Sequence, residues 1–587
     1  MLATLLCCLL SFTGSNKLEL HQPVANFIRA GQSQEYELSA KAKEMTLLQI
    51  ERGSFAAAEE MNLLVSVYGP DEQLLEEINT ANDASLALFV PRVTGRHRVV
   101  ISRWNGAAAG NYQITLALQH TGTAIERATA LLDFMYDDQL PGAAVGWLQS
   151  GQVTFEKTKG MALLGQQQPV HPTAPFDLAS LSKMFTAYGI AILQEQGKIR
   201  ATDKLRDFIP EFPAYAEDIT IHHLVHHLSG VKEYEPALAL VGYTDQSRDM
   251  LSQARILRTL LRHKATYFAP GTDYRYSNAG YFLLAEIISR VTDTPYAEWM
   301  QQEIFLPLGM TDTYVYQADR SVPEQVLRSY RKEDGAYDSI RVHPSAYKWQ
   351  PRNLVAPGTS GIISTLRDML LWADNYSTRK LGGDAVGDII RQGIIPEEQA
   401  WDWWYGFQRY KYRGQEVFYS EGLTQGYRTV FAHFPALAAS LVYLANDGEW
   451  RTYYLARKVM DILLEDQLPA GTLTSARETT PPSVANETPQ STVVPTVTQD
   501  LVGIYVCPTY GASLEVVWQD DRLNLRSLQH GIIPLQPKTD EVFTTDHWFY
   551  DELRFTKSSS GQVTQVAVRN ARDGDTFLFS PSGQIRE

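Results

Sequence analysis

The chain has 587 residues, of which 44% are hydrophobic and 20% charged; this is ordinary usage for folded proteins and predicts roughly three or four domains. Its 52 basic and 67 acidic side chains give a net charge of −15, which disfavours a nucleic-acid partner because a phosphate backbone would be repelled. Three cysteines, Cys7, Cys8 and Cys507, are too few for a disulfide framework or a cysteine zinc site.

The first sixteen residues, MLATLLCCLLSFTGSN, predict a signal peptide. An apolar stretch at 2–10 is followed by small residues, although no Lys or Arg precedes Lys17. We therefore expect an exported protein, periplasmic or extracellular. No other run approaches the ~18 apolar residues of a spanning helix, so we expect no integral membrane span.

Residues 20–120 alternate apolar and polar side chains in short runs, which predicts a β-sandwich. The alternation is clearest in MNLLVSVYGPDEQLL, SLALFVPRVTGRHRVVISRW and GNYQITLAL, and Gly69-Pro70 and Gly110-Asn111 supply turns. The pattern resembles the pre-peptidase C-terminal domain, a jelly-roll-like module found beside secreted peptidases.

Residues 123–467 have a mixed pattern. A helix is expected from 123–126 onward, and AAVGWLQSGQVTFEKTKGMA predicts a hairpin that turns at Ser150-Gly151. Helices are then expected until about Trp372, and strand-like runs return in WWYGFQRYKY, QEVFYSEG, RTVFAHF and ALAASLVYLAND. We expect an α+β layer structure in which helices flank one antiparallel sheet, not a doubly wound parallel sheet.

The last part of the chain begins with a change of composition. Residues 468–498 are dense in Pro, Thr and Ser and have no apolar period, which predicts a linker. Residues 499–587 then contain about eight short alternating runs, which favour a compact β-barrel or sandwich.

One serine–lysine pair is placed for nucleophilic catalysis. A serine hydroxyl needs a base within hydrogen-bond reach, and residues i and i+3 share a helical face. In FDLASLSKMFTAYGIAILQEQGKI, Ser180 can therefore face the Lys183 amine at the start of a helix, whereas Ser182 points elsewhere. Lys183 acts as a base only if burial lowers its pKa from about 10.4. The same spacing recurs at Ser229, Ser329, Ser345 and Ser377.

A second segment selects Ser180 among these copies. In YFAPGTDYRYSNAGYFLLAEIISRV, Tyr276 and Asn278 lie two positions apart just before an amphipathic helix, so both can face one substrate cleft. The phenol of Tyr276 can relay a proton, and the amide of Asn278 can hold a lysine or a carbonyl.

These segments resemble the serine β-lactamase and penicillin-binding-protein superfamily, closest to its class C-like branch with D,D-carboxypeptidases, D-aminopeptidases and family VIII esterases. The resemblance continues through PGAAVGWLQSGQV, ITIHHLVHHLSGV, IFLPLGMTDTYV and GTSGIISTLRDMLLWA and covers about 127–467. It implies a β-lactamase/transpeptidase-like domain in which Ser180 is the acylated nucleophile and Lys183 and Tyr276 share the proton transfers. Asn278 would position the substrate, a small or peptide-like molecule, with no cofactor. The C-terminal barrel resembles the lipocalin-like appendage of some members.

The third motif of the superfamily, usually Lys-Thr-Gly or His-x-Gly on an edge strand, corresponds here to Ser420-Glu421-Gly422 in YSEGLTQGYRT. Because strand side chains alternate, we expect Ser420 to face the cleft and Glu421 to point away. By analogy, Gly422 permits close backbone approach, and the N–H groups of Ser180 and Leu423 form the oxyanion hole. Since the usual cation is missing, neutral esters or amides are expected in preference to anionic acyl groups.

Two other groups of residues allow a different interpretation. The histidines of IHHLVHHLSG have an i, i+4 spacing that can bring two imidazoles to one metal, but the glutamate of His-Glu-x-x-His is absent. We expect no metal there and interpret the segment as helical histidines before a turn capped by Ser229-Gly230. The tryptophans of WDWWYGF are interpreted mainly as core residues, with cleft lining as the alternative. These residues are His222, His223, His226, His227, Trp401, Trp403 and Trp404.

The predicted function is a serine hydrolase that cleaves an ester or amide through an acyl-enzyme, as an esterase, D-aminopeptidase or carboxypeptidase would. The alternatives are a penicillin-binding or sensor protein with little turnover, a class C-like β-lactamase, and a metal-dependent hydrolase centred on the histidines. Gly-x-Ser-x-Gly, the nucleophile elbow of α/β-hydrolases, does not occur in the chain, which disfavours that fold. The oligomeric state stays open.

Overall fold

The fold is described from a computed structural model. The predicted signal segment (1–16) and linker (468–498) lie outside the described residues. Within those residues, no helix combines the length and apolarity needed to cross a bilayer. The structure describes residues 17–29, 32–52, 62–80, 86–103, 110–241, 252–317, 328–332, 347–350, 356–391, 402–449, 451–467, 499–519, 522–527, 531–545, 550–571 and 574–582.

The N-terminal part is a β-sandwich of two four-stranded antiparallel sheets. Alternate residues of its strands are buried, as in β7, where His97, Val99 and Ile101 point inward. This is the burial that a period-two hydrophobic pattern predicts. One sheet has the order β1-β8-β3-β6 (Pro23–Ile28, Gly110–His120, Met45–Arg52, Leu86–Phe89) and the other β2-β7-β4-β5 (Ser33–Ala40, Gly95–Arg103, Leu63–Tyr68, Leu74–Asn79).

A seven-stranded antiparallel sheet forms the core of the central domain, which we define as residues 123–467. β9 and β10 pair as the predicted hairpin, and Ser150 and Gly151 at its turn have the φ angles of +49° and +76° that a tight hairpin turn requires. The sheet joins strands from both ends of this segment. Its order is β10-β9-β22-β21-β20-β19-β18 (Gln152–Lys159, Ala143–Gln149, Ala439–Ala445, Arg428–Phe434, Gln415–Leu423, Phe407–Tyr412, Asp402–Trp404).

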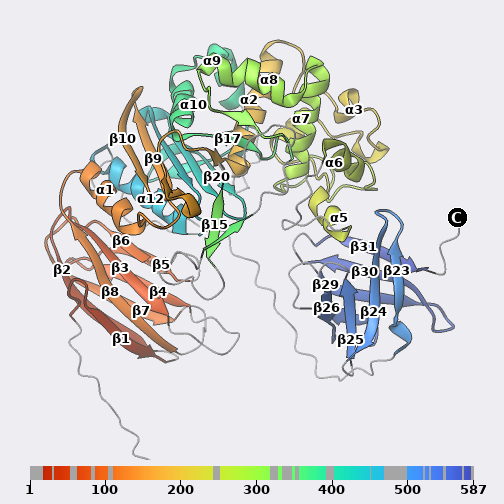
Figure 1. Ribbon diagram of the computed structural model, residues 1–587, viewed down its shortest axis with the longest axis horizontal. Coiled ribbons are helices and arrows are strands. Elements are labelled where there is room, and N and C mark those ends of the chain that lie inside the picture. The colour runs from red at the N-terminus through yellow and green to blue at the C-terminus, as the bar shows by residue number, and fades with distance from the viewer. Residues whose placement is uncertain are drawn as a thin grey trace, which may run out of the picture.

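Helices cover both faces of the central sheet (Figure 1). α10 contacts β9 and β22 on one face, and α1 and α12 lie on the other. α1 begins at a capping box formed by Thr123 and Glu126. α11 and α12 lie beyond the predicted limit near Trp372. The apolar stripe of α11 is short, and its two glycines are poor helix formers, so its sequence gives a weak helix signal. The helices are α1 (Ala124–Met135), α2 (Ser182–Glu195), α3 (Leu205–Phe208), α4 (Ile221–Val225), α5 (Tyr234–Leu240), α6 (Gln253–Leu260), α7 (Asn278–Thr292), α8 (Tyr296–Met300), α9 (Leu306–Leu308), α10 (Leu366–Thr378), α11 (Gly383–Arg391) and α12 (Arg451–Leu464).

Three small antiparallel sheets complete the central domain. β13 lies just before α2 in the chain, and its pairing with β17 fixes the segment that leads into this helix. The small sheets are β11-β12 (Met161–Leu163, Gln168–Pro169), β13-β17-β14 (Phe176–Asp177, Ile362–Ser364, Tyr314–Val315) and β15-β16 (Ser329–Lys332, Tyr347–Gln350).

The sandwich and the central domain bury one continuous hydrophobic core. Apolar side chains of the sandwich belong to the same cluster as those of α1, α12 and one face of the central sheet. Polar contacts fasten the junction, since the Leu88 N–H donates to the Tyr454 hydroxyl (2.8 Å) and Lys458 pairs with Glu76 (2.5 Å). The two parts therefore pack as one unit, although a change of pattern separates them along the chain.

The C-terminal part is a nine-stranded antiparallel sheet that curls into a barrel next to α5 (blue in Figure 1). About eight strands were expected; β27 has only two residues, too few to produce an alternating pattern. The predicted fold class, a sandwich, an α+β domain and a barrel, is confirmed. The order is β26-β25-β24-β23-β31-β30-β29-β28-β27 (Gly531–Pro534, Arg522–Ser527, Ala512–Gln519, Gly503–Cys507, Thr576–Pro581, Val563–Asn570, Tyr550–Lys557, Val542–Thr544, Gln536–Pro537).

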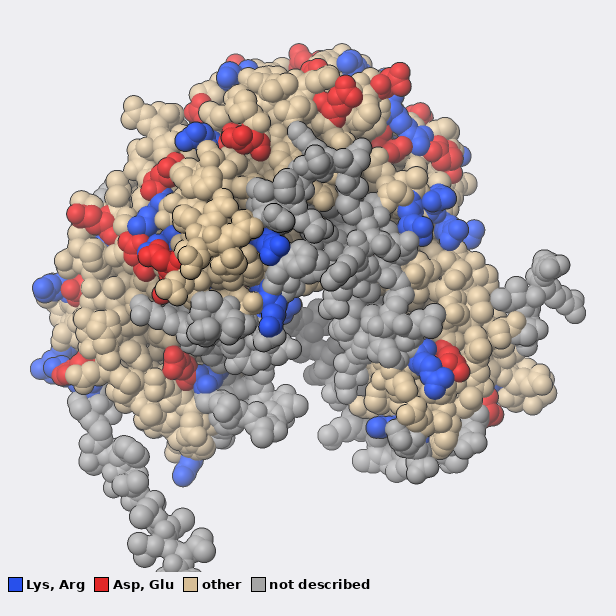
Figure 2. Space-filling view, viewed as in Figure 1, with Lys and Arg blue, Asp and Glu red and all other residues tan. Residues whose placement is uncertain are grey.

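Charged side chains are spread over the surface. Figure 2 shows acidic and basic residues interspersed over the visible face of the central domain. The charged groups of this face are therefore solvated and of both signs.

Candidate active site

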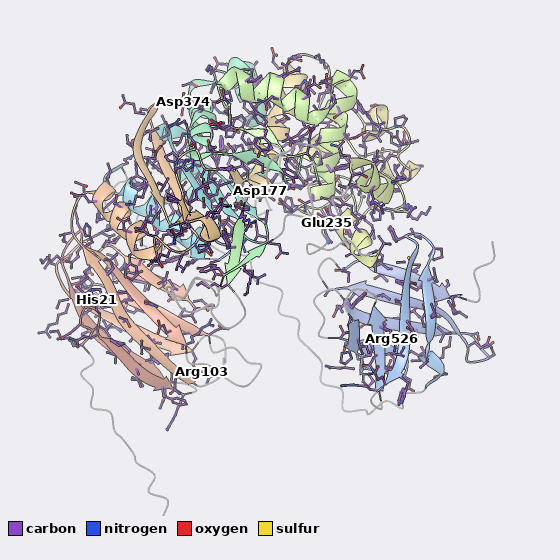
Figure 3. The ribbon with its side chains drawn as sticks, in the orientation of Figure 1. His21, Arg103, Asp177, Glu235, Asp374 and Arg526 are labelled. Atoms are coloured by element: carbon purple, nitrogen blue, oxygen red, sulfur yellow. The ribbon has the colours of Figure 1, made fainter. Side chains whose placement is uncertain are left out.

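The segment before α2 holds Ser180 in a defined position. The Asp177 carboxylate accepts the Ala179 N–H (2.9 Å), and Ala179 has a φ of +51°, which is uncommon for a residue with a side chain. The Leu178 carbonyl accepts the Thr429 hydroxyl of the central sheet (2.9 Å). Ser180 is thus fixed between the sheet and the first turn of α2. Figure 3 labels Asp177 near the middle of the molecule.

Lys183 lies next to Ser180 and is fully buried. Its Nζ donates to Ser180 Oγ (3.3 Å), to Asn278 Oδ1 (2.8 Å) and to the Thr359 carbonyl (2.9 Å). Burial lowers the pKa of Lys183 to about 7, because water no longer stabilises the ammonium form. A lysine base needs this shift, and the amine is in contact with the Ser180 hydroxyl as the i, i+3 spacing predicted.

Tyr276 approaches the same serine from a different segment. Its hydroxyl donates to Ser180 Oγ (2.8 Å), and Lys183 Nζ lies 4.9 Å from the centre of its ring. Tyr276 as a whole residue is 37% exposed, so part of it faces the outside. Loss of hydration nevertheless raises its pKa, which keeps the phenol protonated near neutral pH.

Asn278 is the first residue of α7 and links Lys183 to a pair of carboxyl groups. Its Nδ2 donates to Glu235 Oε1 (2.9 Å), while Glu233 accepts the Ala279 N–H (3.0 Å). Burial, reinforced by the neighbouring Glu235, raises the pKa of Glu233 well above its usual value. Both carboxyl groups raise the pKa of Lys183 and so oppose the effect of burial. Figure 3 shows Glu235 on α5, close to the barrel.

His227 supports the loop that carries Tyr276. Its Nδ1 accepts the Ser277 N–H (3.0 Å), and its ring lies 4.7 Å from that of Tyr276. Burial keeps the pKa of His227 well below its usual value, so the ring is neutral and can accept this hydrogen bond. Sequence reasoning gave His227 no place near Ser180. The only feature of the sequence that could have drawn attention to His227 is its position in HHLSG, and this motif by itself indicates only a turn.

The third motif lies against the nucleophile segment. A Cβ added at Gly422 would be 2.3 Å from the Leu178 carbonyl oxygen and 3.2 Å from Ala179 Cβ, so the close approach requires glycine. Ser420, two residues earlier and on the same face, is 1% exposed, and its hydroxyl has no hydrogen-bond partner among the described residues. Glu421 lies on the other face and accepts the Tyr419 hydroxyl (2.5 Å). The alternation matches the prediction.

The ladder between β20 and β21 fixes the direction of the Leu423 N–H. Thr424 donates its N–H to the Tyr427 carbonyl (3.1 Å), and Leu423 is paired with Arg428 in the register. Hydrogen-bonded and non-hydrogen-bonded pairs alternate in an antiparallel ladder, so the Leu423 N–H points away from β21. This direction leaves it free of the β21 ladder, at the end of β20 that lies beside Ser180.

The other serine–lysine copies lie elsewhere. Ser229 accepts the Val231 N–H in the turn after α4, as expected of a turn residue. Ser329 lies on β15, Ser377 is exposed near the end of α10, and Ser345 lies outside the described residues. Ser182, adjacent to Lys183, accepts the Ile362 N–H (3.1 Å) and is directed away from Ser180.

The described histidines and tryptophans that allowed another interpretation make packing contacts and hydrogen bonds inside the protein. His226 contacts the Trp403 carbonyl (2.9 Å) through Nδ1, and among the described residues no three His, Cys, Asp or Glu side chains are grouped to hold a metal ion. Trp403 is 5% exposed and packs edge-on against Tyr276, with ring centres 5.3 Å apart. Trp404 is buried with Arg409 over its ring, and Trp401 lies outside the described residues.

Comparison with known proteins gives one family for the central domain. Residues 127–463, more than half of the chain, match the family described as Beta-lactamase. Penicillin-binding protein 4* of Bacillus subtilis (strain 168) is 28% identical over 323 residues, 52% of this chain and 68% of that protein. D-aminopeptidase of Gluconobacter oxydans (strain 621H) is 25% identical over 311 residues, 52% of this chain and 56% of that protein.

A solved structure has the same fold. D-amino acid amidase from Ochrobactrum anthropi SV3, complexed with L-phenylalanine amide, matches with a TM-score of 0.51 and 20% identity. The match covers 59% of this chain and 99% of that chain. At this identity the likeness supports the β-lactamase/transpeptidase-like fold and nothing further. The chain spans little more than half of the D-aminopeptidase named above.

Proposed function

The chain belongs to the β-lactamase family, and on that premise we propose that it is a serine hydrolase that works through an acyl-enzyme. The observation that supports this most directly is the convergence of three groups from two segments. Ser180 Oγ lies 3.3 Å from Lys183 Nζ and 2.8 Å from the Tyr276 hydroxyl. A serine with a base in contact is the arrangement that nucleophilic catalysis requires.

The first step is attack of Ser180 Oγ on a substrate carbonyl. Lys183 takes the serine proton, because its pKa of about 7 leaves roughly half of the amine unprotonated at neutral pH, whereas the raised pKa of Tyr276 disfavours a phenolate base. Tyr276 then passes a proton to the leaving group and is reprotonated by the Lys183 ammonium. Water resolves the acyl-enzyme by the same groups in reverse order.

The developing oxyanion is stabilised by backbone donors. The N–H groups of Ser180 and Leu423 are the proposed pair, supported by the contact of Gly422 with the nucleophile segment and by the direction of the Leu423 N–H. One such donor contributes about 3 to 4 kcal/mol to transition-state stabilisation. Asn278 positions Lys183 and the substrate amide or ester.

We propose neutral esters or amides as substrates, of small-molecule or peptide-like size. Ser420 presents a hydroxyl where the family often has a cation, and the acidic pair Glu233 and Glu235 lies behind Asn278. Both features disfavour an anionic acyl group. Esterase and D-aminopeptidase activities fit this chemistry better than a carboxypeptidase-like activity, whose substrate carries a free carboxylate. Two relatives carry the names D-aminopeptidase and penicillin-binding protein.

The deciding experiment replaces the nucleophile. Ser180→Ala should abolish labelling by a fluorophosphonate and turnover of a short-chain nitrophenyl ester, while Ser377→Ala, an exposed serine of the same Ser-x-x-Lys spacing, should behave like the wild type. Labelling that persists in Ser180→Ala would place the nucleophile elsewhere. A panel of β-lactam, D-amino amide, D-Ala-D-Ala and ester substrates then identifies the acyl group.

A second function, a penicillin-binding or sensor protein with little turnover, is favoured by the departure at Ser420. In that case a β-lactam acylates Ser180 and the adduct persists for hours, with a burst of one equivalent and no steady state. A class C-like β-lactamase would instead hydrolyse the β-lactam continuously. A chelator should leave esterase activity unchanged. A loss of activity with chelator would instead indicate a metal-dependent hydrolase.

We also propose that the protein is exported to the periplasm or the extracellular space. Support comes from the apolar residues 2–10, followed by small residues, at the start of the sequence. Fractionation of cells that express the full chain tests this: the protein should be recovered outside the cytoplasm, shortened at its N-terminus.

A further inference from the structure

α5 is shared between the central domain and the barrel. Tyr234 and Leu238 on one side of this helix pack in the core of the central domain. Ala237 and Ala239 belong instead to the apolar cluster of the barrel, with Leu240 packed against it. Figure 1 shows α5 at the junction of the two parts. The barrel therefore holds the helix whose first turn carries Glu235.

One carboxylate of the barrel makes the polar contacts beside this helix. Asp575, just before β31, is 5% exposed and accepts from Lys232 Nζ (2.9 Å) and from the Tyr267 hydroxyl (2.8 Å). A second contact, between the Tyr510 hydroxyl and His263 Nδ1 (2.7 Å), lies close by. A buried carboxylate with two donors is a strong and directional anchor, because its hydrogen bonds are charge-assisted.

Both donors to Asp575 are connected to residues of the candidate active site, one along the chain and one through a side-chain contact. Lys232 immediately precedes Glu233 in the chain. The ring of Tyr267 lies 3.8 Å from the Arg275 guanidinium, and Arg275 immediately precedes Tyr276. The two segments are joined to each other, since the Tyr267 N–H donates to the Gly230 carbonyl (2.7 Å). Asp575 thus connects the segment that carries the acidic pair to the segment that carries Tyr276.

We propose that Asp575 is a positioning residue of the active site, supplied by the C-terminal barrel. It holds α5 against the loop that leads to α7, so that Glu235 keeps Asn278 on Lys183 and Tyr276 stays in reach of Ser180. The barrel is then a working part of the catalytic unit. This inference rests on the proposed function, and it gives the barrel a role that neither the nucleophile nor the family match assigns.

The size of the effect follows from the tolerance of a catalytic site for misplacement. A displacement of about 1 Å caused far from the chemistry can cost on the order of 100-fold in rate. Loosening α5 through Asp575→Ala should therefore lower kcat by about tenfold or more with little change in KM. It should also move the acidic limb of the pH–rate profile to lower pH, because the carboxylates that raise the pKa of Lys183 move away.

The test compares Asp575→Ala and Asp575→Asn with Asp551→Asn in the full chain. Asp551 lies elsewhere on the barrel, where it pairs with Arg569 at the surface, so its substitution is the matched control. Four quantities are measured: kcat and KM for a nitrophenyl ester, the midpoint of the acidic limb, and hydrogen exchange of residues 232–241 and 267–281. Asp575→Asn keeps one acceptor and should show an intermediate loss. Simple destabilisation would lower the active fraction but would leave the pH midpoint in place.

The outcomes separate this inference from the proposed function. Wild-type kcat, pH midpoint and exchange in Asp575→Ala overturn the positioning role, and so do wild-type values in Asp575→Asn if the alanine variant does not fold. Faster exchange confined to the two segments supports it, even if the wild type fails to react with a fluorophosphonate. That failure alone would count against Ser180 as the nucleophile.

Discussion

Arg428 is the cross-strand partner of Leu423, and its guanidinium lies on the face of the central sheet that is turned away from Ser180. Its Nη1 donates to the Thr424 and Tyr427 carbonyls, whereas the next residue, Thr429, contacts the nucleophile segment. The cation nearest to the third motif along β21 therefore braces the turn. It does not replace the lysine or histidine that the family often has at the position of Ser420.

This arrangement predicts a preference for uncharged acyl groups. The nitrophenyl ester of butyrate should have a kcat/KM at least about tenfold higher than the nitrophenyl monoester of succinate, which corresponds to ~1.4 kcal/mol. Steady-state kinetics at low ionic strength measure the ratio. Added salt should change this ratio little, because Glu233 is buried and Glu235 half-buried, and salt screens such charges much less than exposed ones. An equal or higher rate for the succinate ester would contradict the assignment.

The buried amine predicts the pH dependence of activity. Lys183 accepts a proton only in its neutral form, so kcat/KM should rise with pH, reach half of its maximum near pH 7 and level off above it. Below the midpoint the ammonium form dominates and activity is lost. A pH–rate profile for a neutral ester measures this. Activity that is constant between pH 5 and 9 would exclude Lys183 as the base.

Removing the carboxylate of Glu235 should shift that profile in a known direction. Glu235 raises the pKa of Lys183, so Glu235→Gln should lower it and move the midpoint below that of the wild type. The glutamine carbonyl can still accept from Asn278 Nδ2, which preserves the geometry. Glu217→Gln, an exposed carboxylate paired with Arg206, is the control and should leave the midpoint unchanged. A shift to higher pH would refute the electrostatic argument.

Close backbone contact predicts that Gly422 cannot be replaced. In Gly422→Ala the new Cβ would meet Thr429 Oγ1 at 2.1 Å and the Leu178 carbonyl at 2.3 Å, so the nucleophile segment must move. We expect a loss of at least about 100-fold in kcat/KM and a loss of about 1–3 kcal/mol in the free energy of unfolding. Gly165→Ala, where a Cβ meets nothing within 4 Å, is the control. Urea unfolding and ester kinetics are measured in parallel for both variants. Wild-type stability and wild-type kcat/KM in Gly422→Ala would contradict the prediction.

The groups that touch Ser180 could be predicted because each has a local signature. Ser180 and Lys183 share a helical face. Tyr276 lies two residues before Asn278, the first residue of the amphipathic α7, so both were expected to face one cleft. The alternation of β20 likewise predicted that Ser420, and not Glu421, shares the strand face of Gly422, which contacts the nucleophile segment. These are rules about neighbours in the chain, and the resemblance to a family connected the segments.

The supporting groups could not be predicted, because they reach the site across long distances in the chain. Glu235, on α5, contacts Asn278 from 43 residues away, and Thr359, in a turn, contacts Lys183 from 176 residues away. A single glutamate or threonine forms no pattern that indicates its partner. The apolar sequence of α5 predicts burial, but nothing in it indicates that one side packs against a separate barrel.

The core shared by the sandwich and α12 has a consequence for any attempt to shorten this protein. A fragment beginning at Thr123 would expose Tyr454 and the apolar back of the central sheet to water, and it would leave the Lys458 ammonium without Glu76. Such a fragment should aggregate on expression, even though it contains every residue that touches Ser180. The N-terminal strands therefore supply one side of the hydrophobic core that the central sheet and α12 share. Removing these strands should destabilise the central domain.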